Sequence, residues 1–315
     1  MIVEQIRQMA TAGGLGAEGR PVVAMLSGGR DSICLTDVAI ALCGPERVRA
    51  LHVNYRLRGE ASDADERHCA ELCLGLGVAL EVVRARPRER DPGNLQAWAR
   101  ELRYLAATEL AERDDALIAT GHTASDQVET ILYRLAASPG RRALTGMAAR
   151  EGRLIRPLLG ATREQTTAYC EARGLKWRED ESNDSDAYAR TRVRNGVVPA
   201  LRAVHPAAEA NVARTAWLLR EEAELLEGLV AAELGGEESI AIARLRALPS
   251  ALARLIVVSL AERAVGDYVP QAGGRVAEIL DLAERGGGRA ELHVGGRVGA
   301  VIEHGVLSMI ELPPR

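Results

Sequence analysis

The chain has 315 residues, 47% of them hydrophobic and 27% charged, with a formal net charge of −4 at pH 7. This length and apolar content predict one large or two modest domains, and we expect two. No apolar run approaches the roughly 20 residues of a membrane span, and the first residues lack the basic and apolar regions of a signal peptide. We therefore expect a cytoplasmic protein with no membrane partner.

The charge is distributed unevenly along the chain. Residues 141–202 carry 13 basic and 8 acidic side chains, whereas residues 221–315 carry 9 basic and 15 acidic ones. The small net charge therefore conceals a basic middle segment, which is compatible with an anionic partner. The five cysteines include no Cys-x-x-Cys pair, so neither a disulfide framework nor a zinc ribbon is predicted.

Apolar strands and amphipathic helices alternate from the first strand to about residue 170. Strands are predicted at 22–26, 48–54, 78–85, 116–122 and 153–156, and helices at 33–43, 62–77, 94–113, 125–136 and from Thr162 onward. Nearly continuous apolar strands separated by helices predict a doubly wound, Rossmann-like α/β fold with a parallel sheet. Such sheets bind ligands at the carboxyl ends of their strands. The longer loops at 85–93 and 137–147 are expected to border a substrate.

The remaining chain is expected to form a second domain. Residues 178–195 are polar without clear periodicity, and a long amphipathic helix is predicted at 207–230. Segments 286–296 and 299–312 are typical of a late hairpin. We therefore predict a nucleotide-binding catalytic domain at 1–205 and a smaller, mostly helical α+β domain at 206–315.

The stretch SGGRDS, residues 27–32, joins the first predicted strand to the first predicted helix. Gly28 and Gly29 allow the backbone to approach an anion closely, and the N-terminus of the helix adds a positive potential. Asp31 fits beside phosphate only with a divalent cation between them. The lysine-containing pattern of the ordinary phosphate-binding loop is absent from this stretch. An N-capped helix start without a ligand is the alternative interpretation.

The SGGRDS motif resembles the PP-loop ATP pyrophosphatases, whose pattern is Ser-Gly-Gly-x-Asp-Ser. That superfamily cleaves ATP between the α and β phosphates, adenylates a substrate and holds the pyrophosphate in this loop. Six further stretches, in order, resemble its tRNA(Ile)-lysidine synthetase family, in the short form without an extra carboxyl-terminal domain. They are HVNYRLRGEASDADE (52–66), GNLQAWARELRY (93–104), ATGHTASDQVET (119–130), IRPLLGATRE (155–164), WREDESN (177–183) and RTRVRNGVVPAL (190–201).

The resemblance implies a ligase that uses ATP and Mg²⁺. The wobble cytidine of tRNA(Ile) with a CAU anticodon would be adenylated at its C2 oxygen, and free L-lysine would then displace AMP. The implied nucleotide site comprises Ser27, Gly28, Gly29, Arg30, Asp31, Ser32, Val53 and Asn54. Asp31 would be the magnesium ligand and a catalytic residue, and residues 206–315 would form an accessory tRNA-binding domain.

The resemblance also assigns two acids on one helical face, Asp126 and Glu129, to the lysine, with Asp126 as a catalytic residue. Without the resemblance, residues 122–130 are typical of a surface helix that is capped by Thr123 and Asp126 and has a solvated Glu129. His122 is expected to be catalytic, although a lone histidine at a strand end is often structural.

Several arginines are candidates for substrate contacts. Arg103, in preference to Arg100, is expected to reach the active site as a catalytic residue, and an exposed, ion-paired arginine is the alternative. The alternating Arg190, Arg192 and Arg194 predict an extended segment or loop along the tRNA backbone. A solvated run of charges is the alternative for these three.

Two features depart from the family pattern, and two other functions stay open. Ser125 stands where many members have an aspartate, and Tyr55-Arg56 replaces a frequent His-Gly. A tRNA thiolase of the same superfamily is one alternative, which the missing Cys-x-x-Cys disfavours. A non-catalytic ATP-sensing module is the other, which Asp31 and Asp126 disfavour. The oligomeric state is undetermined, and a homodimer is compatible with the sequence.

Overall fold

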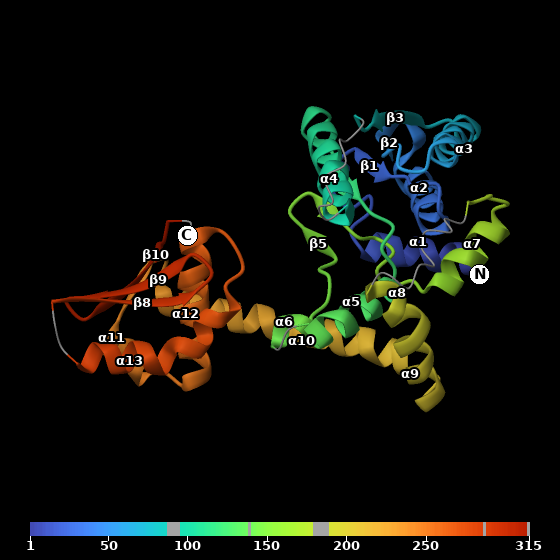
Figure 1. Cartoon of the computed structure of the whole chain (residues 1–315). Helices are drawn as coiled ribbons and strands as arrows, with labels where there is room; N and C mark the ends of the chain where they lie inside the picture. Colours follow the sequence, from blue (N-terminus) through green and yellow to red (C-terminus); the bar gives the residue numbers. More distant parts are fainter. Residues whose placement is uncertain (87–94, 138–139, 179–188, 286–287, 314–315) are drawn as a thin grey trace. The chain divides into compact units, whose positions relative to one another are not determined.

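The computed structural model describes residues 1–86, 95–137, 140–178, 189–285 and 288–313 (Figure 1). The chain divides into two compact units, Met1–Leu219 and Arg220–Arg315. The dividing point lies inside one continuous helix, α10 (Ala208–Leu234). The boundary predicted at 205 lies just before this helix begins. The loop at 85–93 and residues 179–188 lie mostly or wholly outside the described part.

A six-stranded sheet forms the centre of the first unit, in the order β3-β2-β1-β4-β6-β5. All neighbouring strands are parallel except β5, which runs antiparallel to β6. The strands are β1 (Val22–Met25), β2 (Val48–Asn54), β3 (Ala79–Arg84), β4 (Leu117–Ala119), β5 (Arg150–Glu151) and β6 (Leu154–Ile155). This topology confirms the predicted doubly wound α/β fold, with β1 at the centre of the sheet.

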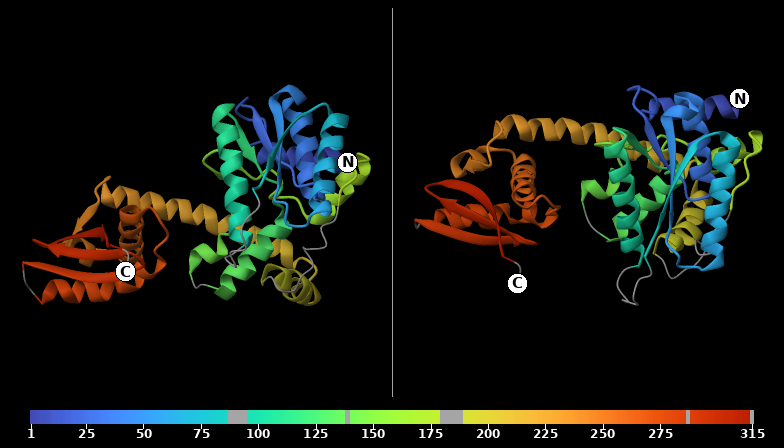
Figure 2. Two further views of the ribbon diagram at one scale, coloured as in Figure 1. Left: turned by 45° about the horizontal axis from the view of Figure 1, so that its top comes forward. Right: turned by 90° about the horizontal axis from the view of Figure 1, so that it is seen from above.

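Helices cover both faces of this sheet (Figures 1 and 2). The helices of this unit are α1 (Ile2–Ala12), α2 (Arg30–Cys43), η1 (Pro45–Arg47), α3 (Glu60–Leu76), α4 (Leu95–Arg113), α5 (Ala124–Ala137), α6 (Arg141–Leu144), α7 (Arg163–Ala172), α8 (Ala189–Arg192), η3 (Val193–Val197) and α9 (Val198–Val204). Val22 and Ala24 of β1 face the core shared by α1, α2 and α7. Val23 and Met25 face α4 on the opposite side. This alternation is why β1 is apolar throughout.

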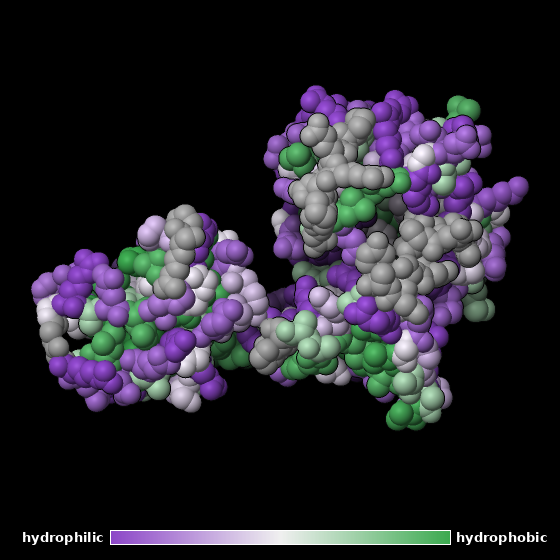
Figure 3. Space-filling view, in the orientation of Figure 1, coloured by the Kyte–Doolittle hydropathy of each residue, from purple (hydrophilic) through white to green (hydrophobic). Residues whose placement is uncertain are grey.

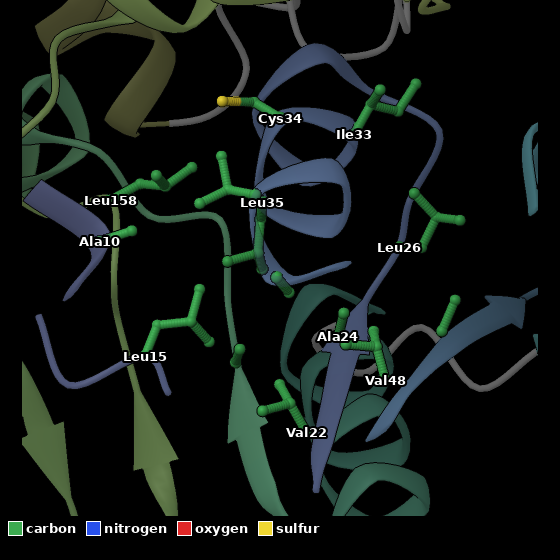
Figure 4. Packing of buried hydrophobic residues seen from close by; sticks show 14 of the residues in the cluster. Ala10, Leu15, Val22, Ala24, Leu26, Ile33, Cys34, Leu35, Val48 and Leu158 are labelled. Carbon is green, nitrogen blue, oxygen red and sulfur yellow. The ribbon is translucent and has the colours of Figure 1, made fainter. Parts of the chain in front are cut away.

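The larger of the two cores packs α2 against β1. Leu35 of α2 lies above Val22 and Ala24, with Leu15 and Leu158 beside them (Figure 4). All five of these side chains are at most 2% exposed, so this core holds the start of α2 rigidly behind the end of β1. On the visible outer surface around α3, hydrophilic side chains predominate (Figure 3).

The segment that carries the three alternating arginines is helical. Arg190 and Arg192 lie in α8, and Arg194 lies in η3, which is a π-helix. The prediction of an extended segment or loop is therefore wrong. Val193 and Val198 pack with Val128 of α5 in a small apolar cluster, and this tertiary packing overrides the local alternation.

The second unit is an α+β module built on an antiparallel sheet of order β7-β10-β9-β8. Its strands are β7 (Ser239–Ala241), β8 (Arg289–Gly295), β9 (Val298–Glu303) and β10 (Val306–Glu311). Its further helices are α11 (Ile242–Ala247), α12 (Ser250–Val265), η4 (Pro270–Arg275) and α13 (Val276–Glu284). Ile256 and Leu260 of α12 pack on Val298 and Ala300 of β9. Among the described residues, no helix combines the length and apolar character needed to cross a membrane.

Candidate active site

The SGGRDS stretch forms the turn between β1 and α2. Gly28 has a φ of +88°, a left-handed conformation that favours glycine, and a Cβ there would lie 3.3 Å from Cys69 Sγ. Gly29 is the N-cap of α2, and Ile33 N donates to its carbonyl at 3.1 Å. The first amides of α2 therefore point out of the helix beside the carboxyl end of the central strand, where an anion would bind.

The two serines of the turn hold its shape. Ser32 Oγ donates to the Gly29 carbonyl at 2.7 Å and accepts from Ser27 N at 3.1 Å. Ser27 Oγ lies 3.1 Å from Ser32 Oγ and accepts from Gly29 N at 3.4 Å. These bonds close the turn on itself, and the Arg178 amide adds one bond from outside, to the Gly28 carbonyl at 3.0 Å. The loop is therefore preorganised mainly by its own residues.

Asp31 has one oxygen engaged and one open. Its Oδ1 accepts from Thr166 Oγ1 of α7 at 2.5 Å and from Arg30 Nε at 3.2 Å. Within the described part of the chain, no residue forms a hydrogen bond with Oδ2 of Asp31, and its side chain is 22% exposed. The carboxylate is therefore fixed from one side and accessible from the other.

The end of β4 approaches the start of α2 closely. A Cβ on Gly121 would lie 2.8 Å from the Asp31 carbonyl oxygen, so only glycine permits this approach. The next residue, His122, has its Nδ1 2.8 Å from Thr120 Oγ1. The pKa of His122 is lowered to about 4, mainly by burial, with Asp126 opposing the shift and the charges of Arg156 and Arg103 adding to it. The imidazole is therefore neutral at pH 7.

The two acids assigned to lysine lie together on α5. Asp126 Oδ2 accepts from Thr123 N at 2.8 Å and from Thr123 Oγ1 at 2.9 Å, which confirms the capping pair. The idea of a solvated Glu129 is wrong, because this residue is only 5% exposed. It accepts two bonds from Arg194, from Nε at 2.6 Å and from the terminal nitrogen at 3.0 Å.

A second arginine lies between the two acids. A terminal nitrogen of Arg163 lies 3.7 Å from Asp126 Oδ1 and 3.7 Å from Glu129 Oε1. The bidentate bond with Glu129 raises the pKa of Arg194, and the charges of Asp126 and Asp31 raise it as well. The anion loop and the acid pair therefore belong to one charged cluster. Ser125, which departs from the family pattern, accepts from Arg163 N at 3.3 Å.

The other predicted site residues lie in three kinds of surroundings: a buried polar contact, the apolar core and the exposed surface of a helix. Asn54 is 2% exposed, and its amide donates to Asp63 at 3.1 Å and to Glu66 at 2.8 Å. Val53 lies in the core against α4. Arg190 and Arg192 are exposed on α8, whereas Arg194 points into the acid pair.

Arg103 borders the site and lies in an arginine cluster with Arg100 and Arg156. Among the described residues, the Nε atoms of Arg103 and Arg156 are buried without a hydrogen-bond partner. Both charges act on His122, as does that of Arg100. The terminal nitrogens of Arg156 donate to the Ala148 carbonyl at 2.6 Å and to Glu151 at 3.4 Å, whereas the Arg103 guanidinium lies over the Tyr104 ring. Positive charge around a neutral imidazole favours an anionic ligand, and Arg103 is the better candidate to bind it.

Four residues with clear contacts in the site were missed as individual site residues by the sequence analysis: Gly121, Arg156, Arg163 and Thr166. Three of them lie within motifs that carried the family resemblance, ATGHTASDQVET and IRPLLGATRE. Thr166 lies just beyond the second motif, and no spacing rule relates it to Asp31, because 135 residues separate them.

The site suits a magnesium ion that is held by one protein carboxylate together with the nucleotide. No group of three or more His, Cys, Asp or Glu side chains that could hold a metal occurs in the described ranges. Magnesium in nucleotide sites commonly uses one or two carboxylates, with phosphate oxygens and water as its other ligands. Asp31, with its open Oδ2 beside the anion loop, fits that pattern.

These features are typical of a nucleotide-binding α/β domain: a loop at the end of the central strand, a helix N-terminus behind it and an open carboxylate beside it. Residues 2–201 match the family described as PP-loop domain, and the chain belongs to this family of ATP-binding domains.

Curated relatives share this similarity over most of the chain. A tRNA(Ile)-lysidine synthase of Symbiobacterium thermophilum is 36% identical over 307 residues, covering 90% of this chain and 64% of the relative. One from Pseudomonas syringae pv. tomato is 38% identical over 221 residues, covering 68% and 48%. One from Bacillus subtilis is 32% identical over 307 residues, covering 90% and 64%. The chain thus spans between about half and two thirds of the length of these relatives.

A solved structure shares the fold. The U34-tRNA thiolase NcsA from Methanococcus maripaludis superposes with a TM-score of 0.58 at 17% identity, covering 70% of this chain and 80% of that one. This likeness concerns the architecture alone.

Proposed function

We propose that this chain converts the wobble cytidine of tRNA(Ile) with a CAU anticodon to lysidine, using ATP, Mg²⁺ and L-lysine. The cytidine C2 oxygen would attack the α-phosphorus of ATP and release pyrophosphate. An amine of lysine would then attack C2, and AMP would leave with the oxygen. The observation that carries the proposal is the acid pair, with Asp126 half-buried and Glu129 buried, in one charged cluster with the anion loop. The names of the relatives agree with it.

The loop and Asp31 would serve the adenylation step. Backbone amides at the start of α2 would bind the pyrophosphate, and Oδ2 of Asp31 would bind Mg²⁺. The metal, when bound, neutralises charge on the phosphates. Arg103 has a buried N–H group without a described partner, and we assign it to anionic atoms of the substrates.

The acid pair would serve the lysine step. We expect the ion pair between Glu129 and Arg194 to open when a lysine ammonium binds, because both cations are attracted to the same two oxygens. Arg194 would then be available for a phosphate group of the tRNA, together with Arg190 and Arg192 on the same helical segment. His122, neutral at pH 7, can accept a hydrogen bond from the attacking amine.

The tRNA would bind mainly to the basic segment 141–202, whose 13 basic side chains exceed its 8 acidic ones. Residues 206–315 are expected to contribute as an accessory domain. Because residues 221–315 are acidic overall, their contacts would depend on individual arginines. A cytoplasmic location and a homodimer stay predictions.

Nucleoside analysis tests the proposal directly. A tRNA(Ile) transcript with a CAU anticodon is incubated with the protein, ATP, Mg²⁺ and lysine, and is then digested and analysed by mass spectrometry. We expect lysidine only in the complete mixture, and none with a transcript that carries uridine at the wobble position. ATP binding without AMP formation would instead support a sensor.

The cysteines disfavour sulfur transfer, the other enzymatic function considered. All five are free and buried. Burial raises the pKa of Cys69 to about 12 and that of Cys73 to about 11, so neither is a thiolate at pH 7. A thionucleoside in the digest would overturn this conclusion.

A further inference from the structure

A threonine far away in the sequence contacts the proposed metal ligand. Thr166, on the second turn of α7, is fully buried, and its Oγ1 lies 2.5 Å from Asp31 Oδ1. The same Oγ1 lies 3.0 Å from the carbonyl oxygen of Arg163. Thr166 contacts neither the acid pair nor the glycines of the loop among the described hydrogen bonds, so its effect on the site is exerted through Asp31.

The proton count fixes the direction of this bond. A threonine hydroxyl has one proton, and both neighbouring oxygens, an ionised carboxylate and a carbonyl, only accept. The carboxylate is the closer and the charged acceptor, so the hydroxyl proton lies on the bond to Asp31. With Arg30 also donating to Oδ1, this oxygen is saturated by protein donors, and Oδ2 faces away from them.

The position of α7 does not depend on this bond. One turn further along, Tyr169 donates to Asp37 of α2 at 2.7 Å, and Arg173 donates to the same carboxylate at 2.9 and 3.1 Å. At its start, α7 has a complete capping box between Thr162 and Gln165. These contacts anchor α7 to α2 without Thr166. The bond from Thr166 therefore acts mainly on the orientation of the Asp31 side chain.

We infer that Thr166 is a positioning residue, which holds the Asp31 carboxylate in the rotamer that presents Oδ2 to the divalent cation of the bound nucleotide. This inference rests on the proposed function, because it takes Asp31 to be a metal ligand. Without the hydroxyl, only the bond from Arg30 restrains the carboxylate, and the cation must then order it more fully at the moment of binding.

Two neighbouring threonines provide a matched comparison. Thr166→Val and Thr166→Ala remove the hydroxyl, and Thr166→Ser keeps it. Thr167→Val is the control, since Thr167 Oγ1 donates to the Arg163 carbonyl at 2.8 Å on the same helix without a contact to Asp31. Binding of Mn²⁺ to the full chain with a non-hydrolysable ATP analogue is followed by electron paramagnetic resonance, without tRNA or lysine.

We expect Thr166→Val and Thr166→Ala to weaken Mn²⁺ binding roughly tenfold, as for loss of a hydrogen bond to a charged group. Thr166→Ser and Thr167→Val should stay within about twofold of the unmodified chain, because both keep the bond to Asp31. The metal-free affinity for the analogue should not change. If Thr166→Val does not fold, Thr166→Ala carries the comparison.

Equal weakening by Thr166→Val and Thr167→Val, or normal Mn²⁺ binding by both hydroxyl-free variants, would overturn the inference. Failure of lysidine formation alongside a Thr166-dependent Mn²⁺ site would refute the proposed reaction and leave the positioning role supported. Absence of nucleotide-dependent Mn²⁺ binding in the unmodified chain would overturn the metal site and the inference together.

Discussion

The two charged regions of the site are built in opposite ways. The anion loop at residues 27–32 is formed by one continuous stretch, and its serines bond to atoms within that stretch. The acid pair on α5 depends on distant partners, since Arg194 lies 65 residues away from Glu129 in the sequence. The loop can therefore be recognised from local sequence, whereas the electrostatic state of the acids is decided by tertiary packing.

This contrast has a functional counterpart. A preformed loop is ready for an anion without rearrangement. The acid pair lies within ion-pair distance of two arginines, so we expect a cationic ligand to compete with them. We therefore expect nucleotide binding to need little change in the protein, and lysine binding to need a side-chain movement.

The largest expected effect is the loss of adenylation in Asp31→Ala. The substitution removes a carboxylate with an open oxygen beside the loop, and pyrophosphate exchange should fall by roughly a thousandfold or more. Asp114→Ala is the control, because Asp114 is also 22% exposed and ion-paired, with Arg49, on a different part of the unit. Comparable losses in both variants would show that the effect arises from folding and not from the site.

Much of the fold could be predicted from the sequence, and the reasons are local. The strand at 48–54 has the predicted bounds, and α7 begins at Thr162 as its N-cap, because apolar runs and capping residues act over a few residues. The anion loop was predictable for the same reason. The bond between Thr166 and Asp31 and the pairing of Arg194 with Glu129 were not, since both depend on how α7 and η3 pack against the sheet and α5.

A second, smaller effect is expected in Asp126→Asn. The amide of asparagine keeps an oxygen that can accept from Thr123 N, but it lacks the negative charge that would bind a lysine ammonium. Lysine incorporation into pre-formed adenylate should fall roughly a hundredfold, with pyrophosphate exchange changed by less than about threefold. The two steps are measured separately with labelled lysine and labelled pyrophosphate. An equal decrease in both would refute the division of labour between the two regions.

Gly121→Ala tests how strongly the position of the anion loop depends on its contact with the end of β4. The added Cβ would meet the Asp31 backbone at 2.8 Å, so the start of α2 must shift. We expect ATP affinity, measured by calorimetry, to fall roughly thirtyfold, since misplacement by a fraction of an ångström weakens several bonds at once. Gly75→Ala is the control, because nothing lies within 4 Å of a Cβ at that position in α3. An unchanged affinity in Gly121→Ala would mean that the loop accommodates the shift.

The smallest effect concerns pH and His122, which lies between the two regions. Burial lowers the pKa of this imidazole from its ordinary value of 6.5 to about 4. As the pH falls below 6.5, the unfolded chain gains a proton at His122 that the folded chain does not bind until about pH 4, so acid favours unfolding. His122→Gln removes this contribution without a charge at either pH.

The free energy of unfolding of the unmodified chain should therefore fall more steeply than that of His122→Gln, by about 2 kcal/mol between pH 7 and pH 5. Urea denaturation of both chains at the two pH values measures the difference. Parallel pH profiles would mean that His122 becomes protonated without resistance in the folded state. The arginines around it would then be too distant or too well screened to keep the region between loop and acids free of an extra positive charge.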